Sequence, residues 1–238
     1  MAKVVVLSGA GISAESGLST FRESDGLWAQ YSVDDICTAG CLISNREQTI
    51  EFYDKRRTEL SDKEPNHAHK VLAHLKNRYK DDLAIITQNV DNLFEKAGIE
   101  PDNLVHLHGE LTKVECESCN HIYDIGYNKL SEVNGGKCVA CGSDQVRPYI
   151  VMFGEMAPQY ETLDKEIQDC SLLVVIGTSG MVVGVNTMAH FIEHSILNNL
   201  APSEAINDSY FDKVFYDKVT NVIDEIAYEI EDRLIEGR

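Results

Sequence analysis

The sequence predicts an α/β fold in which an open sheet of parallel strands, covered by helices, is joined to a smaller lobe. Three observations support this prediction. Short apolar runs recur along the chain and are near-continuous, as expected for parallel strands buried on both faces. Helical patterns separate several of these runs, as crossover connections require. Two longer stretches, 31–80 and 113–147, break the alternation and are expected to be insertions that form the smaller lobe.

The expected strands are short and rich in β-branched residues. The clearest ones are Lys3–Ser8, Leu83–Thr87, Leu104–His108, Tyr149–Phe153 and Leu172–Gly177. A weaker run covers Ser195–Asn199, and Lys213–Tyr216 is a further candidate. Within the first insertion, Glu47–Leu60 is the clearest helix, and Pro65-Asn66 opens a second helix that bears His67, His69 and His74. These histidines lack a complete set of metal ligands, so a structural role is expected for them.

The first strand runs into a glycine turn that is typical of dinucleotide-binding proteins. Gly9, Gly11 and Ala14 follow it as G-x-G-x-x-A. The first glycine permits the tight turn, the second lets a pyrophosphate approach the backbone, and the third small residue lets helix and strand pack closely. The start of the helix offers N–H groups to the phosphates. The larger lobe is therefore expected to be a Rossmann-like domain.

Charge and hydropathy exclude several classes of partner. With 39 acidic and 21 basic residues the net charge is −18, which disfavours binding to a phosphate backbone. A basic peptide is compatible with this charge, although the charge alone implies no partner. No apolar run is long enough to cross a bilayer, and Met1-Ala2-Lys3 leads directly into a strand, so no membrane contact and a cytoplasmic location are expected.

Four of the seven cysteines have the spacing of a zinc ribbon. They form two CxxC pairs, Cys116/Cys119 and Cys138/Cys141, separated by eighteen residues. Four thiolates fill a tetrahedral shell, so one structural zinc ion is expected. The alternative is a redox role, which two pairs at ribbon spacing disfavour. The remaining cysteines, Cys37, Cys41 and Cys170, are expected to be ordinary buried thiols.

These features predict a single catalytic unit over 1–238, assembled from discontinuous segments. The Rossmann-like domain is expected at 1–30, 81–112 and 148–234, the helical module at 31–80, and the zinc-binding module at 113–147. Residues 235–238, Ile-Glu-Gly-Arg, match a protease-cleavage linker used in protein expression and receive no functional weight.

The residues after the glycine turn do not suit hydride transfer. A dehydrogenase of this fold has a second strand that ends in an acidic residue about 20 residues on. Here Asp34 and Asp35 lie at that distance in a polar, helix-like segment, and a loop with Phe21 and Arg22 replaces the second strand.

Polar side chains instead follow the next two expected strands. Gln88, Asn89 and Asp91 come after Leu83–Thr87, at the edge where parallel sheets bind ligands. The following strand ends in His106-Leu107-His108, and a histidine there can take a proton from a sugar hydroxyl. Alternation puts both histidines on one strand face, so either could be the base and either a buried core residue.

Six motifs appear in the order and spacing seen in sirtuins, the NAD-dependent protein lysine deacylases. They are SGAGIS-AESGLSTFR, TQNVDN, HLHGEL, the four cysteines, RPYIVMFGE and GTSG, from residue 4 to about residue 182. The resemblance implies that NAD is consumed as a reactant. The acyl-lysine carbonyl oxygen attacks the nicotinamide ribose, nicotinamide leaves, and His108 activates a ribose hydroxyl that closes on the resulting imidate. The products are free lysine and an O-acyl-ADP-ribose.

The resemblance also implies which residues contact the cofactor. The diphosphate would be held by Gly9, Ala10, Gly11, Ile12 and Ser13, and the reacting ribose covered by Phe21 and Arg22. Gln88 would bind ribose hydroxyls, and Asn89 and Asp91 the nicotinamide ribose and carboxamide. The phosphate and adenosine side would be contacted by Gly177, Thr178, Ser179, Asn199 and Val219.

The substrate is implied to be an acylated lysine in a protein or peptide, bound by a monomeric enzyme. Phe153, Gly154 and Met181 would border its cleft. Tyr53 and Arg56 share one helix face as Tyr-x-x-Arg, and in sirtuins that remove succinyl or malonyl groups this pair binds the acyl carboxylate. Cys37 falls where those members have a small residue. We therefore expect both deacetylase and desuccinylase activity, with a surface arginine and a core tyrosine as the alternative interpretation.

Two other functions remain open at this stage. The same cleavage of NAD could deliver ADP-ribose to a protein side chain. A non-catalytic NAD-binding or zinc-ribbon interaction module is the other alternative, which a base beside the ribose argues against.

Overall fold

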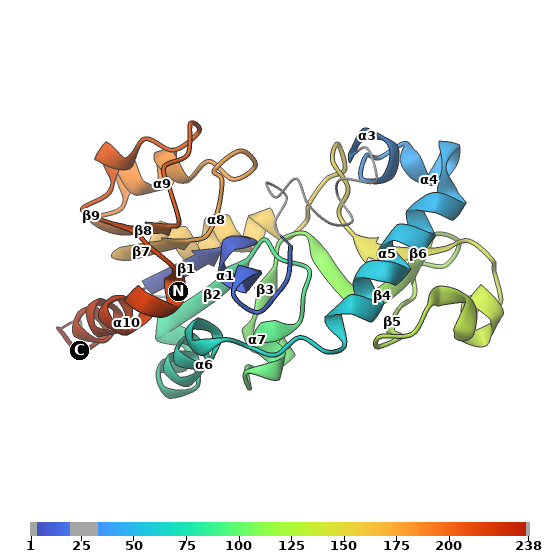
Figure 1. Ribbon diagram of the computed structural model, residues 1–238, viewed down its shortest axis with the longest axis horizontal. Helices are drawn as coiled ribbons and strands as arrows, with labels where there is room; N and C mark the ends of the chain where they lie inside the picture. Colours follow the sequence, from blue (N-terminus) through green and yellow to red (C-terminus); the bar gives the residue numbers. More distant parts are fainter. Residues whose placement is uncertain (1–3, 20–32, 237–238) are drawn as a thin grey trace.

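The computed structural model describes residues 4–19 and 33–236. Figure 1 shows a larger lobe, built on a parallel sheet with its helices, beside a smaller lobe of helices and an antiparallel sheet. The chain crosses between the two lobes several times, so each lobe contains segments that are far apart in sequence.

The larger lobe contains a six-stranded sheet with the order β3-β2-β1-β7-β8-β9. All of its pairings are parallel, which confirms the predicted fold class. Its strands are β1 (Val4–Ser8), β2 (Leu83–Thr87), β3 (Val105–His106), β7 (Leu172–Ile176), β8 (His194–Asn199) and β9 (Lys213–Tyr216).

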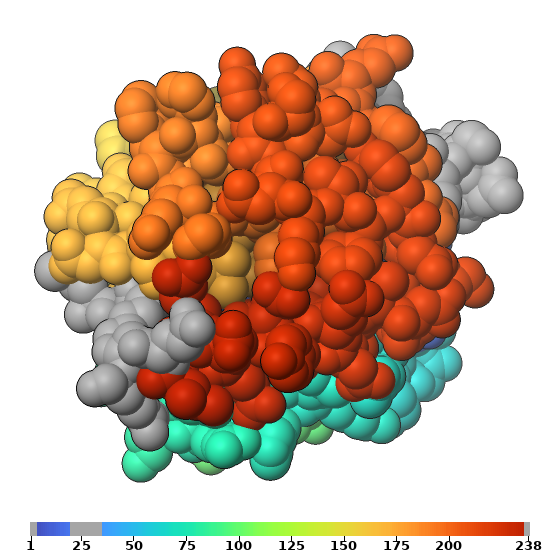
Figure 2. Space-filling view, turned by 90° about the vertical axis from the view of Figure 1, so that its left-hand side faces the viewer, coloured from blue at the N-terminus to red at the C-terminus, as the bar shows by residue number. Residues whose placement is uncertain are grey.

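Both faces of this sheet are covered, because the strands have apolar side chains on each face. Val4 and Val6 of β1 pack on one face in a core that includes residues of α6 (His67–Tyr79) and α10 (Val219–Glu236). Val5 and Leu7 pack on the other face in a core with residues of α8 (Tyr160–Gln168) and α9 (Val185–Phe191). Figure 2 shows that the C-terminal part of the chain, in orange and red, covers most of the side of the molecule that lies at the left of Figure 1.

The smaller lobe combines a three-stranded antiparallel sheet with helices. The sheet has the order β5-β4-β6, from β4 (Gly109–Cys116), β5 (Ile122–Asp124) and β6 (Val146–Ile150). Helix α5 (Arg46–Leu60) packs against β4 and β6 (Figure 1). Two short helices precede α5, namely α3 (Val33–Ile36) and α4 (Cys41–Ser44), and the 3-10 turns η3 (Leu130–Glu132) and η4 (Asn134–Gly136) follow β5.

The remaining elements are short connections in the larger lobe. They are α1 (Gly11–Ala14), α7 (Leu93–Lys96), η1 (Lys80–Asp82), η2 (Pro101–Asn103) and η5 (Asp208–Tyr210). Within 4–19 and 33–236, no helix has the length and hydropathy needed to span a bilayer.

One expected strand pairs differently from the prediction. The run Tyr149–Phe153 was expected to be a parallel strand, but the strand is Val146–Ile150 and pairs antiparallel with β4 in the smaller sheet. Four of its five residues are buried, so its apolar pattern resembles that of a parallel strand. Burial on both faces does not encode the direction of the partner strand.

The expected strand Leu104–His108 is also shorter than predicted, because only Val105 and His106 pair with β2. The chain turns at Gly109, whose φ is +85°. A Cβ at this glycine would lie 2.1 Å from the carbonyl oxygen of Tyr149, so the turn requires glycine.

A buried arginine joins α5 to the rest of the smaller lobe. The Arg57 side chain is fully buried and pairs with Asp54 one turn earlier. Its Nε donates to the Leu111 carbonyl of β4 at 2.7 Å, and Asp54 accepts from the backbone N–H of Leu130 at 3.1 Å. This ion pair therefore connects the helix with both the β4 strand and the loop after β5.

Replacing Arg57 should destabilise the protein strongly. Arg57→Met leaves the Asp54 carboxylate buried without its cation, which costs about 3–5 kcal/mol. The free energy of unfolding in urea, followed by circular dichroism, measures the loss. Lys55→Met is the matched control, because the Lys55–Glu51 pair is on the surface and worth about 1 kcal/mol or less. Equal stability of the two variants would contradict this role of Arg57.

Candidate functional site

The predicted cofactor residues lie at the carboxyl edge of the six-stranded sheet. Ser8 ends β1 in register with Thr87 of β2 and Ile176 of β7, and Thr87 is in register with His106 of β3. Because these strands are parallel, the loops after β1, β2, β3 and β7 all leave the sheet at this edge. Parallel sheets bind their ligands at such an edge.

The glycine turn after β1 packs directly against the loop after β7. The Gly11 N–H donates to the Gly177 carbonyl at 2.8 Å. A Cβ on Gly11 would lie 2.6 Å from the Cα of Gly177, and a Cβ on Gly9 would lie 2.8 Å from its carbonyl oxygen. Gly9 and Gly11 are thus required because the two loops touch at these positions. The sequence pattern alone does not indicate this contact.

One hydroxyl group holds the two polar residues that follow β2. Ser13 Oγ, on α1, donates to Asp91 Oδ2 at 2.9 Å and accepts from Asn89 Nδ2 at 3.1 Å. Burial raises the pKa of Asp91, while hydrogen bonds from the Leu93 N–H and Ser13 act in the opposite direction. Ser13, Asn89 and Asp91 therefore form one connected polar group.

His69 of α6 also reaches this polar group, which the sequence analysis did not foresee. Its Nε2 lies 3.4 Å from Ser13 Oγ. Burial lowers the pKa of His69 to about 3, so the ring is neutral at physiological pH. Asn66 caps the same helix and donates from Nδ2 to the Ile12 carbonyl at 2.7 Å. Helix α6 thus holds α1 in place through Asn66 and His69, and His69 has a structural role.

The two candidate histidines have opposite hydrogen-bonding environments. His106 faces acceptors on both sides: Nδ1 lies 2.8 Å from the Asn89 carbonyl oxygen, and Nε2 lies 3.0 Å from Glu95 Oε1. Both nitrogens must therefore donate, as in an imidazolium. Burial lowers the pKa of His106, but the hydrogen bonds and charge of Glu95 and the Asn89 carbonyl outweigh it and raise the pKa overall.

His108 has only one nitrogen facing a fixed acceptor. Its Nδ1 lies 3.0 Å from the Gln88 carbonyl oxygen, so Nδ1 carries the proton and Nε2 has the lone pair. Burial lowers the pKa of His108, partly opposed by the Gln88 carbonyl. A neutral ring with an available lone pair can act as a base, whereas His106 cannot. The geometry therefore distinguishes the two histidines, which sequence alternation could not do.

The predicted adenosine-side residues lie around the loop after β7. Gln88 Nε2 donates to Thr178 Oγ1 at 3.1 Å, and the Ser179 hydroxyl accepts from the Met181 N–H at 3.3 Å. Asn199 ends β8 and is buried, yet its Nδ2 has no hydrogen-bond partner among the described residues. A buried amide donor without a partner is costly, so this one suits a polar ligand. Val219, also buried, begins α10.

Two of the predicted substrate residues, Cys37 and Phe153, lie side by side where their chain segments pair. The Phe153 N–H donates to the Cys37 carbonyl at 2.8 Å, and Thr38 forms an isolated bridge with Phe153. Gly154 follows with φ +90°. Phe153 is 47% exposed and Met181 is 76% exposed, so both are accessible, and their place beside the substrate stays a prediction.

Tyr53 and Arg56 lie close to Cys37. Tyr53 Oη donates to Cys37 Sγ at 3.5 Å, and burial raises the pKa of both groups, to about 11 for the thiol. The Arg56 side chain is largely buried. Burial lowers the pKa of its guanidinium, while the charges of Glu59 and Asp91 and the proximity of Tyr53 oppose this shift. The structure thus brings the three predicted pocket residues together.

Two of the predicted residues cannot be placed. Phe21 and Arg22 lie outside the described residues, so their part in covering the cofactor stays a prediction.

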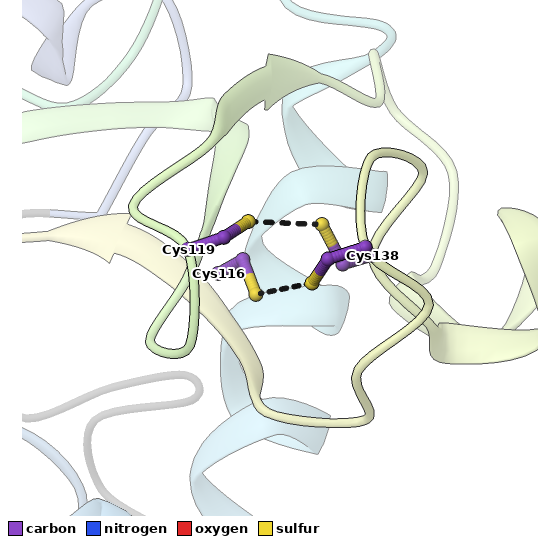
Figure 3. A group of neighbouring side chains, drawn as sticks. Cys116, Cys119 and Cys138 are labelled. Atoms are coloured by element: carbon purple, nitrogen blue, oxygen red, sulfur yellow. Dashed lines mark hydrogen bonds between the residues drawn. The ribbon is translucent and has the colours of Figure 1, made fainter.

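The four predicted cysteines converge in the smaller lobe (Figure 3). The Sγ atoms of Cys116 and Cys141 are 3.6 Å apart, and those of Cys119 and Cys138 are 3.8 Å apart. A tetrahedral zinc ion with Zn–S bonds of about 2.3 Å requires sulfurs about 3.8 Å apart. These two separations match that value and all four sulfurs lie within 4.8 Å of one another, so the residues fit a zinc ion.

The same turn presents each CxxC pair. The Cys116 carbonyl accepts from the Asn120 N–H at 2.8 Å, and the Cys138 carbonyl accepts from the Gly142 N–H at 2.9 Å. Asn120 and Gly142 both have positive φ. Four thiolates leave no coordination position for substrate, so the ion that they would hold is structural. These contacts confirm the predicted four-cysteine site.

The fold and these sites define a class: a Rossmann-like dinucleotide-binding protein with a four-thiolate metal module inserted beside its sheet. Comparison with known proteins identifies the family. The model of the Sir2 family matches residues 9–184. The chain belongs to the Sir2 family, which confirms the resemblance stated from the motifs.

Relatives match over the full length of the chain. It is 44% identical over 237 residues to an NAD-dependent protein deacylase of Campylobacter jejuni (strain RM1221), covering 100% of this chain and 99% of that protein. It is 42% identical to an NAD-dependent protein deacylase of Helicobacter hepaticus (strain ATCC 51449 / 3B1), covering 97% and 98%.

Solved structures share the fold. A Sir2 homologue in complex with NAD has a TM-score of 0.82 and 33% identity, covering 97% of this chain and 90% of that one. A Sir2 variant with a deacetylated p53 peptide and 3′-O-acetyl ADP-ribose has a TM-score of 0.78 and 26% identity, covering 95% and 92%.

Zinc removal should unfold the cysteine module. We expect about one zinc ion per chain by elemental analysis. Cys138→Ser should lose this zinc and lower the melting temperature by roughly 10 °C, because the small core around Val114 and Leu130 has little other support.

Cys170→Ser is the matched control for this experiment, since Cys170 lies in the larger lobe and donates to the Leu172 carbonyl. It should keep the zinc content of the unmodified protein. A Cys138→Ser protein with full zinc content would show that the ion is bound elsewhere.

Proposed function

We propose that this protein is an NAD-dependent protein lysine deacylase that transfers the acyl group of a modified lysine to ADP-ribose. The single observation that supports this most directly is the neutral His108, whose Nε2 carries the lone pair because Nδ1 donates to the Gln88 carbonyl. Family membership and the deacylase relatives agree with it. A binding module would need no base at this position.

NAD, when bound, supplies the activated ribose carbon from which nicotinamide departs, and so it is a reactant. The glycine turn and Thr178 are the residues that would hold its phosphates, and Asn199 has the free amide donor for the adenosine side. Ser13 keeps Asn89 and Asp91 in place at the nicotinamide side through the two bonds described above. Their polar atoms would orient the reacting ribose and exclude competing geometries.

His108 would take the proton from a ribose hydroxyl. Since its Nδ1 proton is bound to the Gln88 carbonyl, the incoming proton is accepted at Nε2. The lowered pKa of His108 keeps the ring neutral at physiological pH, as a base must be. His106, two residues earlier, donates to the Asn89 carbonyl and so would orient the Asn89 segment.

The partner would be an extended acyl-lysine segment of a protein, presented in a cytoplasmic compartment to a monomeric enzyme. Phe153, Gly154 and Met181 would border the cleft, and an extended peptide can pair with exposed backbone there. The net charge of −18 is compatible with a basic peptide as substrate. The same charge disfavours binding to nucleic acid.

We further propose that the acyl pocket accepts succinyl and malonyl groups. Arg56 is a largely buried guanidinium close to Tyr53 and Cys37, and the Cys37 carbonyl accepts a hydrogen bond from the Phe153 N–H. A guanidinium there can bind a carboxylate through two parallel hydrogen bonds, with the Tyr53 phenol as a further donor. An acetyl group has no carboxylate and would not need them.

Incubation with NAD and matched acetyl-lysine and succinyl-lysine peptides, followed by mass spectrometry, tests the proposed function. We expect O-acyl-ADP-ribose, nicotinamide and free lysine. His108→Ala should lower the rate of product formation by about 100-fold or more, because it removes the base. ADP-ribosylated protein would instead indicate a transferase, and no consumption of NAD would indicate a binding module.

Arg56→Met should separate the two acyl activities. Loss of charge-assisted hydrogen bonds should lower kcat/KM for the succinyl peptide by about 10- to 100-fold, while kcat/KM for the acetyl peptide changes by less than about 3-fold. Lys55→Met, on the exposed side of the same helix, should leave both values unchanged. An equal loss with both peptides would mean that Arg56 has only a structural role.

A further inference from the structure

The hydroxyl of Tyr160 lies against the basic nitrogen of His108, and the mechanism above gives it no role. Tyr160 is the first residue of α8, on the opposite side of His108 from the Gln88 carbonyl. Its Oη is 3.2 Å from Nε2. The two rings are tilted by 35° with centroids 6.1 Å apart, so the contact is made by the hydroxyl and not by stacking.

The direction of this hydrogen bond follows from the other side of the ring. Because the Gln88 carbonyl fixes the proton on Nδ1, Nε2 of the neutral ring can only accept. Tyr160 must therefore donate its O–H to Nε2. Burial raises the pKa of Tyr160 above its ordinary value, so the phenol keeps its proton throughout the physiological range.

The charged side chains in this part of the sheet edge each have a partner other than His108. His106 is paired with Glu95, Asp91 with Ser13, and Glu110 with Lys113. Among the described residues, no charged side chain contributes to the pKa of His108, which burial and the Gln88 carbonyl determine. Tyr160 is thus the titratable group in direct contact with Nε2.

We propose that Tyr160 is a positioning residue for His108, whose hydroxyl donates to Nε2 of the neutral ring and accepts from Nε2–H once the ring is protonated. The proposal rests on the role proposed for His108. A phenol oxygen has both a proton and lone pairs, so rotation of the O–H bond suits it to either state.

The proton balance of the step is simple. Nε2 has one in-plane lone pair and accepts one hydrogen bond at a time. The ribose hydroxyl would therefore replace the Tyr160 hydroxyl as the donor to Nε2. The ribose O–H bond would break and an N–H bond form at Nε2, while the ribose oxygen bonds to the acyl carbon of the imidate and the π pair of its C=N bond moves to the lysine nitrogen. The new Nε2–H then donates to Tyr160 Oη until the proton passes to water. Tyr160 gains and loses no proton.

Hydrogen bonds to charged groups are stronger than those between neutral groups, so Tyr160 stabilises the imidazolium more than the neutral ring. Tyr160→Phe keeps the ring and removes only the hydroxyl. The pKa of His108 should then fall by roughly half to one unit. The nuclear magnetic resonance titration of the His108 ring protons in the NAD-free protein measures this shift without any turnover.

The pH profile gives the second measurement. In Tyr160→Phe the acid limb of kcat/KM should move to lower pH by the same amount, because this limb reports the base in the free enzyme. The maximal rate should fall by about 2- to 5-fold, since a weaker base accepts the proton less readily. Loss of packing alone would lower the rate without moving the limb.

Tyr216→Phe is the matched control, since Tyr216 lies on β9, at the opposite edge of the sheet from β3, and its hydroxyl donates to Asp208. It should leave both the titration and the profile unchanged. An unshifted or raised pKa of His108 in Tyr160→Phe would overturn the proposal. Absence of turnover by the unmodified enzyme would instead refute the proposed function, while the titration would still report on Tyr160.

Discussion

The close contact between the loop after β1 and the loop after β7 is the constraint on which the site depends. Neither Gly11 nor Gly177 has room for a side chain, because each backbone occupies the space of the other's Cβ. This contact fixes α1 at the sheet edge and so fixes Ser13. The Ser13 hydroxyl then determines where Asn89 and Asp91 lie. The positions of Ser13, Asn89 and Asp91 therefore depend on having glycine at positions 11 and 177.

A backbone carbonyl fixes one nitrogen of each histidine ring, and a side chain at the other nitrogen decides the charge of the ring. The Asn89 and Gln88 carbonyls fix the Nδ1 protons of His106 and His108. What differs is the group at Nε2: a carboxylate for His106 and a phenol for His108. The first makes a cation and the second leaves a neutral base. Two histidines, one at the end of β3 and one two residues later, thus differ in charge because of one neighbour each.

The sequence was most informative where local chemistry determines structure. The apolar runs located β1, β2 and β7 to within a residue, and the spacing of the cysteines predicted the four-thiolate site. The partner of β6 could not be predicted, because burial on both faces looks alike in parallel and antiparallel sheets. Tyr160 and His69 were missed for another reason. Each touches the site from a separate helix, and no local spacing connects them to His108 or Ser13.

The adjacent arginines of α5 have a consequence for how new specificities can arise. Successive residues of a helix point about 100° apart, so Arg57 faces Asp54 and β4 while Arg56 faces Tyr53 and Cys37. Arg57 thus maintains the architecture, while its neighbour Arg56 would line the proposed acyl pocket. A substitution at position 56 can therefore change which acyl groups are accepted without destabilising the fold, because the residue that the fold requires is Arg57.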